Sequence, residues 1–357
     1  MDGRGLLAAA GVLIPDGEGR IMLVRVSYEA KHPIEIPGGG WEPPDASPRV
    51  TAVREIEEEL GITPRLGPIA CLDWARDWSR PPIAAFLYWA EPLTPAELAG
   101  LRLEAEELSS YAFLTPEQVA SALPPRLSRR VTACLRAPRS AGPLELEDGR
   151  PVGHSAEHLP ADPPVPPYTA AEGVPLTGGD RPAPPPPMDR ETYIASRPRI
   201  RAKARTLYTD RAGRVLLVRL RPLLPDEPPY WTVPGGSIEA DRELPREAAA
   251  RETLEELGWS HRPTGRLLAL DWTAPGDGSR PVLVYLFDGG EVGPADLAAI
   301  RLPADELLEW RMFTPDEARE ALSPQGHRRL TAALAARDAA GGTAGAGPVE
   351  LHDGFPV

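Results

Sequence analysis

Residues 37–62, PGGGWEPPDASPRVTAVREIEEELGI, align without a gap on residues 234–259, PGGSIEADRELPREAAARETLEELGW. Each stretch joins a Pro-Gly-Gly turn to a segment that is crowded with glutamate. Proline and glycine mark the turn, and the segment that follows has helical spacing of its apolar residues. A pattern of this length that occurs twice indicates that the chain contains two copies of one domain.

The similarity extends outward from these stretches on both sides. GRIMLVRV (19–26) corresponds to GRVLLVRL (213–220), and GPLELEDGRPV (142–152) corresponds to GPVELHDGFPV (347–357). The 357 residues are also enough for two domains of ordinary size. We therefore predict a first domain over 1–152, a linker over 153–199 and a second domain over 200–357.

The segment between the copies is rich in proline, with 11 prolines among the 28 residues of 160–187. Proline at this density disfavours helices and central strands and favours extended polyproline. The simplest interpretation is a spacer, and a docking segment for a proline-binding module is the alternative.

The sequence pattern of each copy predicts several strands and a few helices. The apolar runs at 21–26 and 215–220 are typical of strands, and the opening run LLAAAGVLI (6–14) is expected to be a buried first strand. A helix should begin near Pro48 or Pro245 and end at Gly61 or Gly258. A last helix should open at 115–117 or 314–316. These elements predict an α/β sandwich with a mixed sheet in each copy.

Composition excludes several classes of protein. The formal net charge is -13 and the sequence pI is about 5.1, so non-specific binding to nucleic-acid polymers is not expected. No run is long and apolar enough for a membrane span. Asp2 offsets Arg4, so the opening run lacks the positive start of a signal peptide. Cys71 and Cys134 have no metal-binding spacing, which favours buried free thiols and a cytoplasmic location.

The glutamates are placed by helical geometry. One stripe of the first predicted helix is apolar and should face the core: Val53, Ile56 and Leu60. Three glutamates fall on the opposite side at spacing i, i+3 and i+4: Glu55, Glu58 and Glu59. The second copy repeats this glutamate trio as Glu252, Glu255 and Glu256. Like charges at this spacing cost only a few tenths of a kcal/mol per pair, so an ordinary acidic surface is an alternative.

The glycines before each helix favour a binding site. Gly38 and Gly39, like Gly235 and Gly236, allow the backbone to adopt positive φ and to approach a ligand closely. A loop that leads into a helix N-terminus suits anions, and three carboxylates suit Mg²⁺ or Mn²⁺. A cation between carboxylates and phosphates neutralises charge and activates water. The combination predicts a bound polyphosphate.

These residues resemble the signature of the Nudix hydrolase superfamily, which runs G, five residues, E, seven residues and R-E-U-x-E-E-x-G-U, with U a bulky apolar residue. The first copy matches at Gly40, Arg54, Glu55, Ile56, Glu58, Glu59, Gly61 and Ile62, but has Ala46 for the first Glu, with Asp45 beside it. The second copy matches at Glu243, Arg251, Glu252, Glu255, Glu256 and Gly258, but has Ser237, Thr253 and Trp259 at three signature positions. The resemblance covers about 5–152 and 200–357.

The resemblance implies two Nudix-type α/β/α sandwich domains and Mg²⁺-dependent hydrolysis of a nucleoside diphosphate linked to another moiety. Both glutamate trios would bind divalent cations, and one member of each, with Glu58 and Glu255 as candidates, would deprotonate the attacking water. Arg54 and Arg251 would orient the acidic side chains. In this family the first Glu mainly partners the arginine, so its loss as Ala46 weakens the first copy without removing a ligand.

A row of cations distinguishes the second copy. Basic residues recur at every second position in Arg197, Arg199, Arg201, Lys203 and Arg205, which on a strand would share one face. They would form a positively charged surface for substrate phosphates, with Arg205 as a candidate substrate-binding residue. The alternative is that their charge protects an edge strand from pairing with another chain. The first copy has Ala9 and Gly11 at the corresponding last two positions. The second copy is therefore the stronger catalytic candidate.

Two other interpretations stay open at the level of sequence. One is a nucleotide-binding or regulatory module, with the first copy the more suited to being inactive. The other is a purely structural first copy that supports the second. Residues 107 and 306, both glutamate, precede the last helix of each copy and are expected to lie on the surface.

Overall fold

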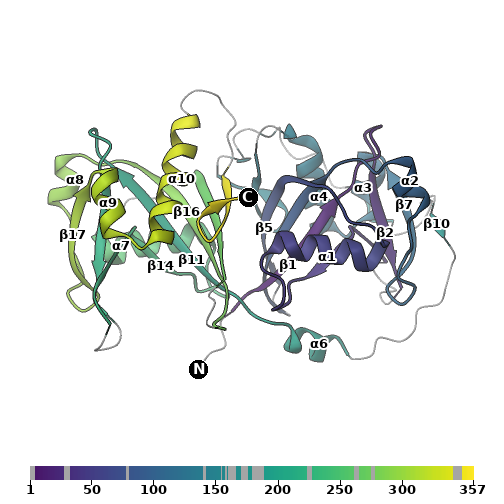
Figure 1. Ribbon diagram of the computed structural model, residues 1–357, viewed down its shortest axis with the longest axis horizontal. Coiled ribbons are helices and arrows are strands. Elements are labelled where there is room, and N and C mark those ends of the chain that lie inside the picture. The colour runs from purple at the N-terminus through teal and green to yellow at the C-terminus, as the bar shows by residue number, and fades with distance from the viewer. Residues whose placement is uncertain are drawn as a thin grey trace. The chain divides into compact units, whose positions relative to one another are not determined.

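The computed structural model describes residues 5–27, 33–77, 80–139, 142–153, 155–156, 159, 166–169, 176–178, 189–222, 227–260, 265–274, 278–340 and 348–357. The chain forms two compact units, Leu7–Arg199 and Ile200–Val357 with Met1–Leu6 (Figure 1). Most of the proline-rich segment, namely 160–165, 170–175 and 179–187, lies outside the described residues.

The elements of the first unit alternate between strands and short helices. They are β1 (Leu7–Leu13), β2 (Ile21–Val26), β3 (Ile34–Glu35), β4 (Gly38–Gly40), α1 (Pro48–Leu60), β5 (Leu66–Asp77), β6 (Arg80–Ala90), α2 (Pro95–Ala99), β7 (Leu108–Leu114), α3 (Pro116–Ala122), α4 (Pro125–Arg136), β8 (Leu144–Glu147), β9 (Arg150–Pro151), β10 (Thr177–Gly178) and α6 (Arg190–Ser196).

Two sheets build this unit within the described residues. The larger has the order β4-β1-β6-β5-β8-β9 and the smaller has the order β10-β7-β2-β3. The larger sheet is mixed, because β1 pairs in parallel with β6 and antiparallel with β4. Buried apolar residues of both sheets and of α3 and α4 share one core cluster. The expected mixed α/β architecture is confirmed.

The second unit repeats the element order of the first unit from β1 to β9. It contains β11 (Arg201–Thr209), β12 (Val215–Leu220), β13 (Tyr230–Thr232), β14 (Gly235–Ser237), α7 (Pro245–Leu257), β15 (Leu267–Thr273), β16 (Val282–Glu291), α8 (Pro294–Ala298), β17 (Leu307–Phe313), α9 (Pro315–Ala321), α10 (Pro324–Ala340), β18 (Val349–His352) and β19 (Phe355–Pro356). Its strands follow the order β13-β12-β11-β16-β15-β18-β19, with β14 on β11 and β17 on β12. Here the pair Thr209–Val215 links the two halves of the sheet.

The helices that carry the glutamates begin and end where the sequence predicts. Ser47 caps α1 by accepting a hydrogen bond from the Val50 amide, and Pro48 occupies the first turn. Gly61 and Gly258 follow the two helices in the left-handed conformation, with φ of 68° and 72°. A left-handed residue ends a helix, and glycine adopts it without a Cβ penalty. α1 packs on β4 and on β1, beside which it is labelled in Figure 1, and α7 packs on β11 and β14.

The last predicted helix of each copy is in fact two helices. In the first unit α3 ends at Ala122 and α4 begins at Pro125, and in the second unit α10 begins at Pro324. Proline lacks an amide donor and its ring clashes with the preceding turn, so it starts a new helix rather than continuing the old one. The proline-rich segment also differs from a free spacer where it is described. Its strand β10 pairs with β7, and Leu176 packs against the core of the first unit.

Other expectations from the sequence are confirmed. β1, β2 and β12 coincide with the predicted apolar strands. Cys71 and Cys134 are buried and free. In the described part of the chain, no helix has both the length and the apolar character that crossing a bilayer requires.

Candidate functional site

Each glutamate helix faces the glycine turn that precedes it, which is β4 (Gly38–Gly40) in the first domain and β14 (Gly235–Ser237) in the second. β4 pairs antiparallel with β1, and α1 packs on both strands. β14 and α7 have the same relation to β11. The turn is thus fixed by a strand on one side and by the helix on the other.

The last glutamate of each trio bonds to the backbone of the turn. The Gly38 amide donates to Oε2 of Glu59 at 2.9 Å, and the Gly235 amide donates to Oε2 of Glu256 at 2.6 Å. Both carboxylates are buried, with exposed fractions of 6% for Glu59 and 1% for Glu256. Helical spacing placed this glutamate opposite the core, which is wrong, because β4 or β14 covers it.

The first glutamate of each trio occupies space beside the backbone that a glycine leaves open because it has no Cβ. A Cβ added at Gly39 would lie 2.4 Å from the carboxylate of Glu55. A Cβ at Gly236 would lie 2.6 Å from the carboxylate of Glu252. Since real Cβ contacts are never this short, glycine here makes room for a carboxylate beside the backbone. The Gly-Gly pair and the glutamates are therefore one structural unit.

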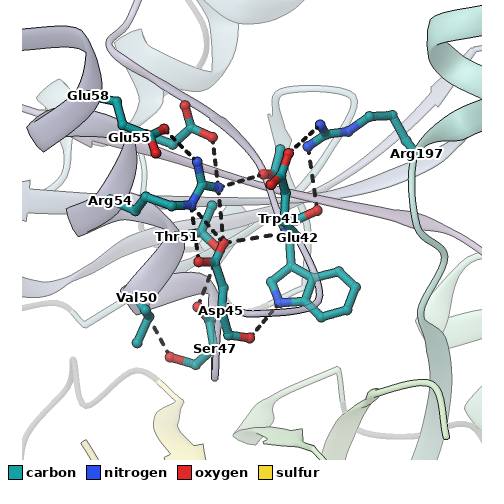
Figure 2. A network of polar contacts seen from close by, with 11 residues as sticks. Trp41, Glu42, Asp45, Ser47, Val50, Thr51, Arg54, Glu55, Glu58 and Arg197 are labelled. Atoms are coloured by element: carbon teal, nitrogen blue, oxygen red, sulfur yellow. Dashed lines mark hydrogen bonds and ion pairs between the residues drawn. The ribbon is translucent and has the colours of Figure 1, made fainter. Parts of the chain in front are cut away.

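An arginine collects the remaining acidic groups of the first domain, as Figure 2 shows. Arg54 Nε and Nη2 donate to Asp45 at 3.1 and 3.0 Å. Nη2 also lies 3.0 Å from Glu55 Oε1 and donates to the Gly40 carbonyl, while Nη1 donates to Glu58 at 2.8 Å. Glu58 is the exposed member of its trio.

The second domain builds the same arrangement with a different acid. Arg251 Nε and Nη2 donate to Glu243 at 2.9 and 2.8 Å, and Nη1 donates to Glu252 and Glu255 at 2.8 and 2.7 Å. Its Nη2 also bonds to the Ser237 carbonyl. Asp45 thus holds Arg54 as Glu243 holds Arg251, although Asp45 stands one residue before the signature position.

Asp45 is a site residue whose role the sequence pattern did not assign. It is buried and accepts further hydrogen bonds from the Thr51 hydroxyl and the Glu42 amide. The available signal was its position next to Ala46. The replacement of the signature Glu by Ala46 was expected to weaken the case for the first copy. Arg54 nevertheless keeps a carboxylate partner, because Asp45 takes the place of that glutamate.

Burial dominates the electrostatics of the trios. Burial and the nearby charge of Glu55 raise the pKa of Glu59 to about 9, although the Gly38 amide opposes the shift. Burial also raises the pKa of Glu55 to about 7 and that of Glu256 to about 7. The smaller shift at Glu256 has a local cause, because the Arg205 guanidinium favours its ionised form. Nearby positive charge therefore does not offset the cost of burying the ionised glutamates at either site, and the imbalance is larger in the first domain.

Arg205 lies beneath the second glycine turn. It is 8% exposed, and its Nη1 donates to the carbonyls of Val233 and Gly235. Its counterpart Gly11 lies opposite Gly38, and a Cβ there would meet the Ile36 side chain at 2.7 Å. An apolar side chain thus fills the place that the arginine takes in the second domain.

The cation row is only partly on one strand. Because β11 begins at Arg201, only Arg201, Lys203 and Arg205 share a strand face. The expectation is wrong for Arg197 and Arg199, since Pro198 between them has no amide to donate to a ladder. Lys203 pairs with Ser237 in the register of β11 with β14.

The described residues contain no cluster of three Asp, Glu, His or Cys side chains already arranged to enclose a metal ion. The arginines are the reason. Arg54 forms ion pairs with Glu55 and Glu58, while Glu59 accepts a hydrogen bond from the Gly38 amide. Two further glutamates add negative charge nearby. Glu107 and Glu306 are exposed, as expected, and each helps to raise the pKa of the first and last glutamates of the trio in its domain.

Comparison with known proteins gives consistent matches in both halves. The profile of the NUDIX domain matches residues 5–133 and 199–334. The chain is 28% identical over 126 residues to the uncharacterized Nudix hydrolase orf19 of Rhodococcus erythropolis, covering 32% of this chain and 66% of that protein. It is 39% identical over 92 residues to CMP-5'-(N-acetyl-N-hydroxy-3-aminopropyl)phosphonate hydrolase of Streptomyces rubellomurinus, covering 26% of this chain and 41% of that protein. The chain thus spans less than two thirds of either relative.

Solved structures match as well. The MutT protein of Methanosarcina mazei Go1 has 23% identity and a TM-score of 0.30, with 35% of this chain and 85% of that chain covered. The ORF135 protein of E. coli has 24% identity and a TM-score of 0.32, with 40% and 95% covered.

Proposed function

This chain belongs to the Nudix family, and from that premise we propose that it is a divalent-cation-dependent pyrophosphohydrolase. Its substrate would be a small molecule in which a nucleoside diphosphate is linked to another moiety, such as a nucleotide, a sugar or a second nucleoside. The observation that carries the proposal is the same in both domains. The last glutamate of each trio is buried on the Gly-Gly backbone, the first lies beside that backbone, and an arginine holds the third nearby.

The residues present fit a hard divalent cation. Carboxylate oxygens are preferred ligands of Mg²⁺ and Mn²⁺. Burial raises the pKa of Glu59 and of Glu256, and a bound cation would favour the ionised form of both carboxylates. We propose that Mg²⁺, with Mn²⁺ as an alternative, is held by the glutamate trios Glu55, Glu58 and Glu59, and Glu252, Glu255 and Glu256. A bound cation would neutralise phosphate oxygens and lower the pKa of a water molecule.

The protein's own groups would bind the diphosphate and move the proton. The backbone of Gly38 and Gly39, and of Gly235 and Gly236, would lie against the diphosphate, with the charge of Arg205 beneath the second turn. Glu58 or Glu255 would accept the proton of the attacking water, because each is the exposed member of its trio. Water oxygen would bond to one phosphorus as the bridging P–O bond breaks, and the other phosphate would leave with the bridging oxygen.

Arg54 and Arg251 have a positioning role in this proposal. Each bonds to one acid outside its helix, Asp45 or Glu243, and to two members of its trio. A planar guanidinium with a fixed fork of donors sets the directions of the carboxylates that it binds. Since the first domain keeps this arrangement, we propose that both domains are active. The second should be the faster, because Arg205 and Lys203 add positive charge that the first domain lacks at Gly11 and Ala9.

A substrate screen with paired variants tests the proposal. Nucleoside triphosphates, ADP-ribose, dinucleoside polyphosphates, nucleotide sugars and a CMP-linked phosphonate would be incubated with the full chain, with and without Mg²⁺. The last compound is included because the Streptomyces relative is a hydrolase of a CMP-linked phosphonate. Glu58→Gln and Glu255→Gln, alone and together, should each remove part of the activity, and the double variant nearly all of it. Turnover that is unchanged in the double variant would refute the assignment.

A further inference from the structure

An arginine from outside the repeat contacts the glycine turn of the first domain. Arg197 follows α6 and belongs to the first unit, Leu7–Arg199. Its Nη1 donates to Glu42 at 3.0 Å and its Nη2 donates to the Trp41 carbonyl at 3.4 Å. Figure 2 shows the guanidinium reaching the segment from which Arg54 also takes a carbonyl. The two arginines therefore approach the same end of β4.

Gly40 leaves the space that this guanidinium occupies. A Cβ added at Gly40 would lie 1.9 Å from Nη2 of Arg197. At the corresponding place the second domain has Ser237, which carries a Cβ. The approach of Arg197 is thus possible in the first domain only because residue 40 is glycine.

The two domains also differ in the residue of the first strand that pairs with residue 40 or 237. Gly40 lies opposite Ala9 in the register of β4 with β1, whereas Ser237 lies opposite Lys203 in the register of β14 with β11. The second domain therefore has a cationic side chain from its own first strand, where the first domain has a methyl group. Arg197 brings a cation to the same end of the turn from a different part of the chain.

We propose that Arg197 is a positioning residue for the substrate diphosphate in the first domain, where it supplies the charge that Lys203 supplies in the second. This inference rests on the proposed function, and it makes the first site dependent on a segment that follows the first repeat. Arginine has five N–H donors, and Glu42 and the Trp41 carbonyl engage two of them. The Arg197 side chain is 16% exposed, so it is not fully enclosed by the protein.

Kinetics of the first domain test this role in the full chain. With the second domain silenced by Glu255→Gln, Arg197→Ala should raise KM about tenfold or more and change kcat less, which is the loss of one charge-assisted hydrogen bond to phosphate. Arg197→Lys should recover part of that loss. Arg199→Ala is the matched control, because it removes a neighbouring guanidinium that donates to the Ile194 carbonyl. Equal KM values for Arg197→Ala and Arg199→Ala would overturn the proposal.

Two further variants separate positioning from structure. If the Arg197–Glu42 ion pair were only structural, Glu42→Gln and Arg197→Ala would shift KM in the same direction. For a positioning role, Glu42→Gln releases the arginine and should leave KM unchanged or lower. Gly40→Ser should displace Arg197, so that the double variant Gly40→Ser/Arg197→Ala is no worse than Gly40→Ser alone. Additive effects in this double-mutant cycle would count against the contact.

A binding measurement keeps the two proposals distinguishable. Calorimetric titration with inorganic pyrophosphate and Mg²⁺ does not require turnover. Binding that weakens in Arg197→Ala but not in Arg199→Ala would support the role of Arg197 even if no substrate in the screen were cleaved. Pyrophosphate binding that is identical in all variants would refute the role of Arg197 and leave the hydrolase proposal to the screen.

Discussion

Asp45 holds Arg54 through three hydrogen bonds of 3.1, 3.3 and 3.0 Å, in the place that Glu243 takes on Arg251. Aspartate is shorter than glutamate by one methylene, and it stands one residue earlier in the chain. The two changes offset each other, so the guanidinium reaches the trio in both domains. The first domain has lost a signature residue without losing the interaction that the residue provides.

Asp45→Asn should therefore impair the first domain as Glu243→Gln impairs the second. Arg54 would lose its buried counter-charge and bind Glu55 and Glu58 more tightly, away from a cation. We expect at least a tenfold loss of first-domain kcat and roughly 2 kcal/mol of stability, as for breaking a partly buried ion pair. Turnover by the Glu255→Gln chain and its chemical denaturation would measure both.

The control is Glu57→Gln, which removes an exposed carboxylate of the same helix that accepts a hydrogen bond from the Thr63 hydroxyl. If Asp45→Asn kept full activity in the Glu255→Gln background, Arg54 would not need this partner.

The helix boundaries and the glutamate trios could be predicted because they depend on local chemistry. Pro48 sets the start of α1 and Gly61 sets its end, and both act on their own neighbours in the chain. The burial of Glu59 could not be predicted from helical spacing alone, because it depends on how β4 crosses the helix. Spacing gives the face on which a side chain lies but not what covers that face.

The contacts of Asp45 and Arg197 could not be predicted from the sequence for a related reason. Asp45 reaches Arg54 because of the path of the loop between β4 and α1, which no periodicity encodes. Arg197 stood in a row of alternating cations, which suggested a strand of the second domain. Its actual partner, Glu42, lies 155 residues earlier in the chain. Alternation indicates a common face only where the strand itself continues.

Mg²⁺ should stabilise the chain, and Glu59→Gln should remove part of that effect. Burial penalises the Glu59 carboxylate, so the glutamine variant should be more stable than the parent without a cation. A ligand that binds only the folded state stabilises it by about 2.7 kcal/mol at a hundredfold excess over its Kd. Thermal unfolding with and without saturating Mg²⁺ would show both changes.

The matched control is Glu57→Gln on the same helix, because Glu57 is exposed and bonds to the Thr63 hydroxyl. Its response to Mg²⁺ should equal that of the parent chain. A Glu59→Gln chain that gained the full Mg²⁺ stabilisation would exclude Glu59 as a ligand.

The two glycines of the first turn should respond differently to alanine. At Gly39 the nearest atoms to the added Cβ are those of the movable carboxylate of Glu55, so Gly39→Ala should fold but bind Mg²⁺ more weakly. At Gly38, φ is 137° and the Cβ would lie 2.3 Å from the Ala10 carbonyl oxygen. Gly38→Ala should therefore lose more than about 2 kcal/mol of stability, because backbone cannot move aside cheaply. Circular dichroism melts and Mg²⁺ titrations would separate the two, and equal behaviour would contradict this account.

The second domain should bind its substrate more weakly above pH 8, through Lys203. Burial first, and then the charges of Arg205, Arg201 and Arg329, lower the pKa of Lys203 to about 8. As pH rises through that value the lysine loses its proton, and the positive charge beside Ser237 disappears. KM of the second domain, measured with Glu58→Gln in the first, should rise across this interval. Lys203→Arg should abolish the rise, because arginine stays charged.

Stability should follow the opposite course to binding at this residue. Between about 8 and the ordinary value of 10.5 the folded chain holds fewer protons on Lys203 than the unfolded chain, so the free energy of unfolding increases with pH there. Lys203→Met should be more stable than the parent below pH 8 and should lose this increase. The first domain, with Ala9 at the corresponding place, should show neither effect. A pH-independent KM in the second domain would mean that Lys203 does not face the bound phosphates.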